Sequence, residues 1–131
     1  MRDLSVLIVD DDDLTRNCMK RIFEMVFKWK KIVVAESGES ALEKLEEDNF
    51  DLLLTDRTMP PGMNGEELIR RAKLIRPAIK SIMITGDLNL FGVDGFGNTC
   101  LVRDVGANRV LKKPAQIVEI ENAVRGLFPL G

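Results

Sequence analysis

The chain has 131 residues, of which 45% are hydrophobic and 31% are charged, with 19 basic and 21 acidic side chains. This length and composition fit one globular domain with a single core. A net charge of −2 argues against a strongly basic nucleic-acid binder, and no apolar run is long enough for a transmembrane helix. We expect one domain over residues 1–131, a cytoplasmic location because no signal peptide is recognisable, and neither nucleic acid nor membrane as a direct partner.

Two residue types limit the chemistry of the chain. There is no histidine, which removes the commonest general base and the commonest zinc ligand. Cys18 and Cys100 lack the spacing of a metal site, so we expect two reduced thiols, at least one of them in the core. Any chemistry must therefore depend on carboxylates, hydroxyls and amines.

Apolar runs alternate with amphipathic stretches through the first half of the chain. Residues 5–9, 31–35 and 51–55 have the continuous apolar character of strands in a parallel sheet. The helix expected after the first strand has a predicted buried stripe of Leu14, Cys18, Met19, Ile22, Phe23 and Val26. Ser37 is placed to cap a second helix.

The same alternation continues to the end of the chain. Asn64 is placed to open a third helix, which Pro77 ends. Residues 81–85 and 109–111 are predicted to be the fourth and fifth strands, and Pro114 to begin the last helix. The pattern predicts a doubly wound α/β domain with helices on both faces of a mostly parallel sheet.

The stretch between the last two predicted strands is unusually rich in glycine. From Gly86 to Asn98 we expect an irregular loop, with only a short helix after about Asn98. Phe91 and Phe96 within it are predicted to pack locally, the alternative being an exposed surface for a partner.

Polar residues follow four of the predicted strands at their C-terminal ends, where ligands bind in this class of fold. They are Asp10, Asp11, Asp56, Thr85 and Lys113. Two carboxylates about 4 Å apart repel by roughly 4 kcal/mol at an effective dielectric constant near 20. A hard cation such as Mg²⁺ relieves this repulsion and shares phosphate oxygens, and an aspartate can attack phosphorus. The set therefore predicts a divalent cation acting together with a phosphoryl group.

Neighbouring residues have simpler interpretations. Asp12 and Asp13 are interpreted as carboxylates at the start of the first helix, where the helix dipole favours them. Lys112 is interpreted as a surface lysine. The basic and aromatic run at residues 27–31 is interpreted as a solvated helix end rather than as a nucleic-acid surface.

Four motifs, "IVDDDD", "LLLTDRTMPPGMNG", "SIMITG" and "GANRVLKKP", together resemble the receiver domain of two-component response regulators. They occur in the order of that family and cover nearly the whole chain. The resemblance implies a flavodoxin-like domain whose five-stranded parallel sheet has the order 2-1-3-4-5. It also implies a signalling module rather than a turnover enzyme, with a sensor histidine kinase or a histidine phosphotransfer protein as phosphodonor.

The resemblance assigns roles to single residues. It implies that Asp56 accepts the phosphoryl group and that Asp10, Asp11, Asp56 and the backbone carbonyl of Thr58 hold Mg²⁺ or Mn²⁺. Thr85 and Lys113 take the roles of the switch hydroxyl and the phosphate-pairing amine. The peptide bond between Lys113 and Pro114 is implied to be cis.

The chain departs from the family pattern in three places. The loop after the third strand is one residue longer, with Pro61 and Gly62 before Met63. Val110 stands where receivers commonly carry an aromatic residue whose rotamer changes together with the position of the threonine. Switching through such an aromatic side chain is therefore in doubt. The glycine-rich segment is several residues longer than usual. Asp87, two positions after Thr85, is expected to affect the lifetime of the phosphoryl group, as is Thr58.

Two other interpretations remain open. The stretch "IVDDDDLT" partly matches a motif of haloacid-dehalogenase-like phosphatases. The chain, however, lacks the acidic pair that this family has after the lysine, here Lys113, and it has Leu14 where the motif needs threonine or valine. A receiver-like interaction module that signals without phosphate is consistent with Val110 and the altered loops, but not with the complete set of polar residues.

Overall fold

The computed structural model describes residues 2–129 and contains a parallel sheet of five strands. In chain order they are β1 (Arg2–Val9), β2 (Trp29–Ala35), β3 (Leu52–Asp56), β4 (Lys80–Thr85) and β7 (Arg109–Lys112). Their order across the sheet is β2-β1-β3-β4-β7, with every neighbouring pair parallel. Numbered by sheet strand alone, this is the expected order 2-1-3-4-5, so the predicted fold is confirmed.

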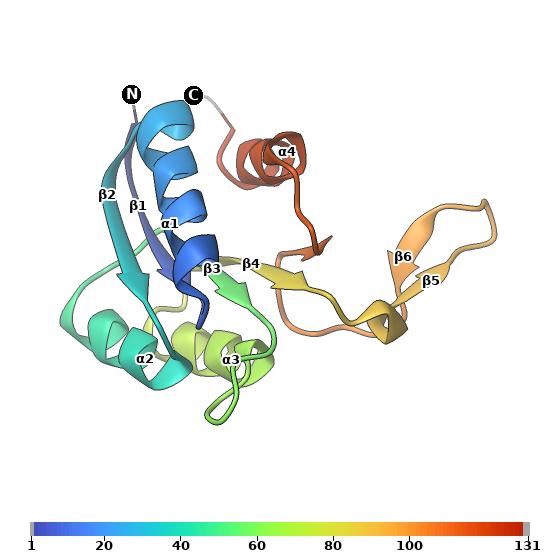
Figure 1. Cartoon of the computed structure of the whole chain (residues 1–131), viewed down its shortest axis with the longest axis horizontal. Coiled ribbons are helices and arrows are strands. Elements are labelled where there is room, and N and C mark those ends of the chain that lie inside the picture. The colour runs from blue at the N-terminus through green and yellow to red at the C-terminus, as the bar shows by residue number, and fades with distance from the viewer. Residues whose placement is uncertain (1, 130–131) are drawn as a thin grey trace.

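Four α-helices cover the two faces of the sheet (Figure 1). They are α1 (Asp13–Arg21), which continues as a π-helical turn η1 (Ile22–Phe27), α2 (Gly38–Glu47), α3 (Gly65–Ile75) and α4 (Ile117–Leu127). None of the helices between residues 2 and 129 has the length and apolar character needed to cross a bilayer.

The apolar side chains of each central strand alternate between two cores. Leu7 and Leu53 point to the core shared with α2 and α3. Val6 and Leu54 point to the core shared with η1 and α4. Because successive residues of a strand face opposite sides of a sheet, a run of apolar residues is the expected pattern for strands buried on both faces.

Side chains fix the starts of the helices. The Ser37 hydroxyl accepts the backbone N–H of Ser40 at 3.1 Å, and Asn64 Oδ1 accepts that of Glu67 at 2.9 Å, as the sequence predicts. The last helix begins at Ile117, so the predicted start at Pro114 is wrong. The backbone N–H of Gln116 is satisfied by Glu119 Oε1 at 2.9 Å, which sets the start of α4 there.

The buried face of the first helix differs from the predicted stripe. Phe23 is fully buried and packs edge-to-face on Phe27 and Trp29, with ring centroids 4.8 and 5.1 Å apart. Leu14, Val26 and Cys18 are exposed, so their predicted burial is wrong. A π-helical turn contains more residues than an α-helical turn, so η1 rotates Val26 out of a four-residue stripe. Leu14 and Cys18 lie in α1, before this turn.

Two smaller expectations also change. Cys100 is only half-buried and Cys18 is exposed. The expectation that at least one cysteine lies in the core is therefore wrong. The run at residues 27–31 includes Phe27, where η1 ends, and Lys28, which caps it, but Trp29 is buried and opens β2 rather than lying in a solvated helix end.

The glycine-rich segment forms a β-hairpin. A 3₁₀ turn, η2 (Leu88–Leu90), leads into the antiparallel strands β5 (Phe91–Val93) and β6 (Thr99–Leu101). The described chain has no α-helix between β4 and β7, and η2 comes before Asn98, so the predicted short helix after about Asn98 is wrong. Asp94 Oδ1 accepts the N–H groups of Phe96 and Asn98 at 2.8 and 2.9 Å, which closes the tip as an ordered turn.

The hairpin projects away from the sheet and its helices (Figure 1). At its base, Leu90 and Val105 are buried in the core on the α2 and α3 side. Phe91 is half-buried, with the Lys112 ammonium 4.9 Å from its ring centroid, so its predicted local packing is confirmed. Phe96, at the tip, is 92% exposed, and its predicted packing is wrong.

Candidate functional site

The predicted polar residues meet at one edge of the sheet. Asp10 follows β1, Asp56 ends β3, Thr85 ends β4 and Lys113 follows β7. Asp10, Asp56 and Thr85 are buried. Carboxylate oxygens of Asp10, Asp11 and Asp56 all lie within 4.8 Å of one another. Parallel strands end at a common edge, and this places side chains from distant parts of the sequence together.

Lys113 is the direct counter-charge of Asp56. Its ammonium nitrogen Nζ lies 3.0 Å from Asp56 Oδ2. Its backbone N–H donates to the Thr85 carbonyl at 2.8 Å, which fixes the loop after β7 against the end of β4. The peptide bond to Pro114 is cis, as expected. One ammonium thus faces a group of three carboxylates.

Asp10 is held rigidly at the centre of this group. Its backbone N–H donates to the Ala35 carbonyl at 3.2 Å, its carbonyl accepts Arg16 Nη1 at 2.8 Å, and its Oδ1 accepts the Asp12 N–H at 2.9 Å. Burial raises the pKa of Asp10, against the lowering effect of the Asp12 N–H, and the charge of Asp56 raises it further. The neighbouring hydrogen bond and positive charge therefore do not fully offset the cost of burying the ionised Asp10 carboxylate.

The donor set fits a hard divalent cation. All three groups are carboxylates, the ligand type that Mg²⁺ prefers, and the described cluster includes no sulfur or imidazole ligand. A cation held there would supply the positive charge that Asp10 lacks.

The run of four aspartates divides in two, as predicted. Asp12 caps α1, accepting the N–H of Thr15 at 3.0 Å and its hydroxyl at 2.6 Å, and these hydrogen bonds lower the pKa of Asp12. Asp13 is the first residue of α1 and pairs with Arg16. Asp12 and Asp13 therefore serve the helix.

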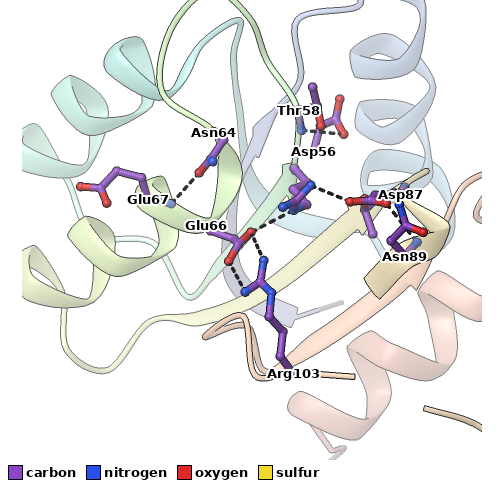
Figure 2. Close-up of polar contacts among 10 residues, drawn as sticks. Asp56, Thr58, Asn64, Glu66, Glu67, Asp87, Asn89 and Arg103 are labelled. Carbon is purple, nitrogen blue, oxygen red and sulfur yellow. Dashed lines mark hydrogen bonds and ion pairs between the residues drawn. The ribbon is translucent and has the colours of Figure 1, made fainter. Parts of the chain in front are cut away.

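The two threonines of the site differ in their contacts. The Thr58 N–H donates to Asp56 Oδ1 at 3.4 Å (Figure 2). Ligation of a cation by the Thr58 carbonyl stays a prediction. The Thr85 hydroxyl oxygen accepts the Asp87 N–H at 3.0 Å. Thr85 is thus linked to the loop that leads into the hairpin.

Four charged residues beside the site form what we call the Arg57 network, and the sequence analysis singled out only Asp87 among them. Arg57 Nε lies 2.9 Å from Glu66 Oε2, and Arg57 Nη1 lies 3.1 Å from Asp87 Oδ2. Arg103 contacts both oxygens of Glu66, at 2.8 and 2.9 Å (Figure 2). The hydrogen bonds from Arg103, and then those from Arg57, lower the pKa of Glu66. For the three residues that were missed, the only local signal was an arginine directly after Asp56.

Gly65 makes the close approach of α3 to the site possible. A Cβ atom at this position would lie 2.4 Å from the carbonyl oxygen of Asp56. The Gly65 N–H donates to the Arg57 carbonyl at 2.7 Å. Only glycine leaves room for this contact between the start of α3 and the end of β3.

An apolar recess opens next to the polar residues. Its volume is about 530 Å³, and it lies between α1 and the loop after β7, lined by Leu14, Thr15, Cys18, Met19, Ile84, Lys113, Pro114 and Ala115. Leu14 is 72% exposed on its rim. The recess gives a protein partner apolar surface to contact beside the charged site.

Comparisons with known proteins agree on one family. The model of the response regulator receiver domain matches residues 6–125. The chain is 35% identical over 126 residues to the response regulator receiver protein CpdR of Brucella abortus, covering 94% of each. It is 30% identical to sporulation initiation phosphotransferase F of Bacillus subtilis, covering 99% of this chain and 98% of that protein.

Solved structures give the same result. A CheY-like receiver domain protein from Methanospirillum hungatei has a TM-score of 0.74 and 28% identity, covering 95% of this chain and 93% of that one. Some curated relatives are longer, and the chain spans only 31% and 55% of two of them.

Proposed function

Because the chain belongs to the response regulator receiver domain family, we propose that it is a phosphorylation-dependent signalling module whose phosphoacceptor is Asp56. The observation that carries this proposal is the position of Asp56. Its carboxylate ends β3, lies within 4.8 Å of Asp10 and Asp11, and pairs with Lys113 at 3.0 Å. A nucleophilic carboxylate, an acidic pair and an ammonium are the groups that phosphoryl transfer to an aspartate needs.

The transfer forms one bond and breaks another. An oxygen of the Asp56 carboxylate bonds to phosphorus as the bond between phosphorus and the donor breaks. With a phosphohistidine donor protonated on its second ring nitrogen, the electron pair of the P–N bond stays on the leaving nitrogen, and a neutral imidazole is released. The chain has no histidine, so a phosphohistidine donor lies outside these 131 residues.

The remaining residues take positions around the transferred group. Asp10 and Asp11 would hold Mg²⁺ together with Asp56 and the carbonyl of Thr58. When bound, the ion neutralises charge on the phosphoryl oxygens. Lys113 pairs with one phosphoryl oxygen, and the Thr85 hydroxyl donates to another.

The proposed partners follow from the family match, and the apolar recess is their proposed docking surface. A sensor histidine kinase or a histidine phosphotransfer protein docks on the apolar recess next to Lys113, in the cytoplasm, and delivers its phosphoryl group to Asp56. Phosphorylation then changes the affinity for a downstream partner. The family match favours this function over the phosphatase interpretation, and the complete set of polar residues favours it over a phosphate-independent module.

Intact-mass measurement with acetyl phosphate and Mg²⁺ tests the proposal. The wild type should gain the mass of one phosphoryl group, Asp56→Asn should gain none, and the matched variant Asp104→Asn, at an exposed position, should behave as the wild type. An unmodified wild type would support the phosphate-independent module. Rapid turnover of unrelated phosphate esters would support a phosphatase. A gain in Asp56→Asn equal to that of the wild type would contradict the assignment of Asp56.

A further inference from the structure

The Arg57 network connects the site to the hairpin formed by β5 and β6. We propose that it couples the phosphorylation state of Asp56 to the attachment of the hairpin, which makes the hairpin the output element of this chain. This inference rests on the proposed function, because it needs phosphorylation of Asp56. Each step of the connection is a contact between described residues.

The first step joins Thr85 to Asp87. The Thr85 hydroxyl oxygen accepts the Asp87 N–H at 3.0 Å, so the position of that hydroxyl and the backbone of Asp87 depend on each other. Thr85 is 1% exposed, which leaves water little access to replace the contact.

The second step joins Asp87 to the beginning of the hairpin. Asp87 Oδ1 accepts the Asn89 N–H at 3.0 Å, and its carbonyl accepts the Leu90 N–H at 3.2 Å, so Asp87 caps η2. The Leu90 carbonyl in turn accepts the Val102 N–H at 2.9 Å. A displacement of Asp87 therefore reaches both strands of the hairpin at their base.

The third step joins the same aspartate to the end of the hairpin. Arg57 bridges Asp87 and Glu66, and Glu66 holds Arg103 through two hydrogen bonds (Figure 2). Arg103 lies two residues after β6. The beginning and the end of the hairpin are thus held by one chain of ion pairs that starts beside the phosphoacceptor.

Phosphorylation of Asp56 changes which group the Thr85 hydroxyl contacts. A phosphoryl group adds oxygens at Asp56 that need hydrogen-bond donors, and the Thr85 hydroxyl is the buried donor at the neighbouring strand end. Movement of that hydroxyl toward the phosphoryl group removes the acceptor of the Asp87 N–H. The Asp87 backbone then shifts, and its ion pair with Arg57 loosens. The hairpin base becomes less firmly held.

Val110 cannot serve as a switch residue in this chain, so the coupling through the Arg57 network matters more. It is half-buried in the core beneath the hairpin, and a valine side chain has a single stiff torsion angle and cannot swing between a buried and an exposed position. The charged connection supplies a mechanical link that Val110 cannot.

Hydrogen exchange on the full chain, read by mass spectrometry, tests the coupling. Exchange over residues 88–103 should rise several-fold when acetyl phosphate and Mg²⁺ phosphorylate the wild type. Glu66→Gln should raise this exchange before phosphorylation and should remove most of the further rise. Arg103→Gln, at an exposed position, should have the same two effects on exchange, and it leaves the contacts of Arg57 with Glu66 and Asp87 in place. Glu67→Gln is the matched control, since Glu67 pairs only with Arg70 and Arg71 among the described ion pairs.

Intact mass on the same samples separates the two proposals. A wild type that gains no phosphoryl group would contradict the proposed function. A phosphorylated wild type with unchanged exchange over residues 88–103 would overturn the coupling alone. The coupling would also be wrong if phosphorylated Glu66→Gln and Arg103→Gln showed the full rise of the wild type, or if Glu67→Gln lost it.

Discussion

The ammonium of Lys113 lies 3.0 Å from Oδ2 of Asp56, although Asp56 ends β3 and Lys113 follows β7. The same ammonium has to pair with the phosphoryl group once Asp56 is modified. Removing it should therefore slow phosphorylation.

Lys113→Met should reduce the rate of phosphorylation by acetyl phosphate by about 10²-fold, the usual effect of losing one donor to developing charge. The rate is measured by intact mass over time. Lys112→Met is the matched control and should retain the wild-type rate within about threefold, because the Lys112 ammonium lies over the Phe91 ring and not at Asp56. Equal rates for Lys113→Met and wild type would remove Lys113 from the site.

Asp10→Asn should stabilise the protein in the absence of divalent cations. The raised pKa of Asp10 means that the folded state binds the proton more tightly than the unfolded chain does. The ionised carboxylate therefore destabilises the fold above its folded pKa, and this cost disappears below the ordinary value of 3.8. Urea unfolding at neutral pH should show a higher free energy of unfolding for Asp10→Asn than for the wild type.

The gain should vanish in acid, and Mg²⁺ should no longer stabilise Asp10→Asn as it stabilises the wild type. The asparagine keeps an oxygen for the Asp12 N–H, so the local backbone is preserved. A variant that loses stability at neutral pH would show that the cost of burying the ionised Asp10 carboxylate is not the dominant effect.

Gly65→Ala tests the close contact between α3 and β3. The new Cβ would lie 2.4 Å from the Asp56 carbonyl oxygen, and backbone must move to admit it. We expect a loss of about 1–3 kcal/mol in the free energy of unfolding, typical of overpacking, together with slower phosphorylation. Gly95→Ala at the hairpin tip, where a Cβ has no atom within 4 Å, should change stability by less than about 0.5 kcal/mol. Equal stabilities of the two variants would contradict the described approach.

Phe23→Ala and Leu14→Ala test which face of α1 and η1 is buried. Phe23 is fully buried against two aromatic rings, so its removal should cost about 3–5 kcal/mol. Leu14 is 72% exposed, and its truncation should stay within about 0.5 kcal/mol. Urea unfolding of both variants measures the difference. A larger loss for Leu14→Ala would restore the stripe expected from the four-residue spacing.

The strands and the strand-end residues were predictable from the sequence because both follow local rules. An apolar run of five residues between polar stretches is a parallel strand, and a carboxylate at its C-terminal end lies at the edge where ligands bind. Asp10, Asp56, Thr85 and Lys113 were found in this way. The caps at Ser37 and Asn64 also depend on only three or four neighbouring residues.

The parts that were missed depend on contacts over long distances or on irregular backbone. The hairpin was expected to be a loop because its glycines weaken a helix, but they are equally suited to the tight turn at Asp94. The link between Glu66 and Arg103 spans two elements that no spacing rule connects. The π-helical turn of η1 changes the face of the helix in a way that regular periodicity does not represent.

The central claim is that Asp56 carries the phosphoryl group, and chemical trapping measures this directly. Borohydride reduces an aspartyl phosphate to homoserine, and peptide sequencing by mass spectrometry then locates the converted residue. After treatment with acetyl phosphate and Mg²⁺, we predict homoserine at position 56 and at no other position of the chain. Homoserine at position 10 or 11, or a phosphorylated protein that yields no homoserine at position 56, would contradict the account.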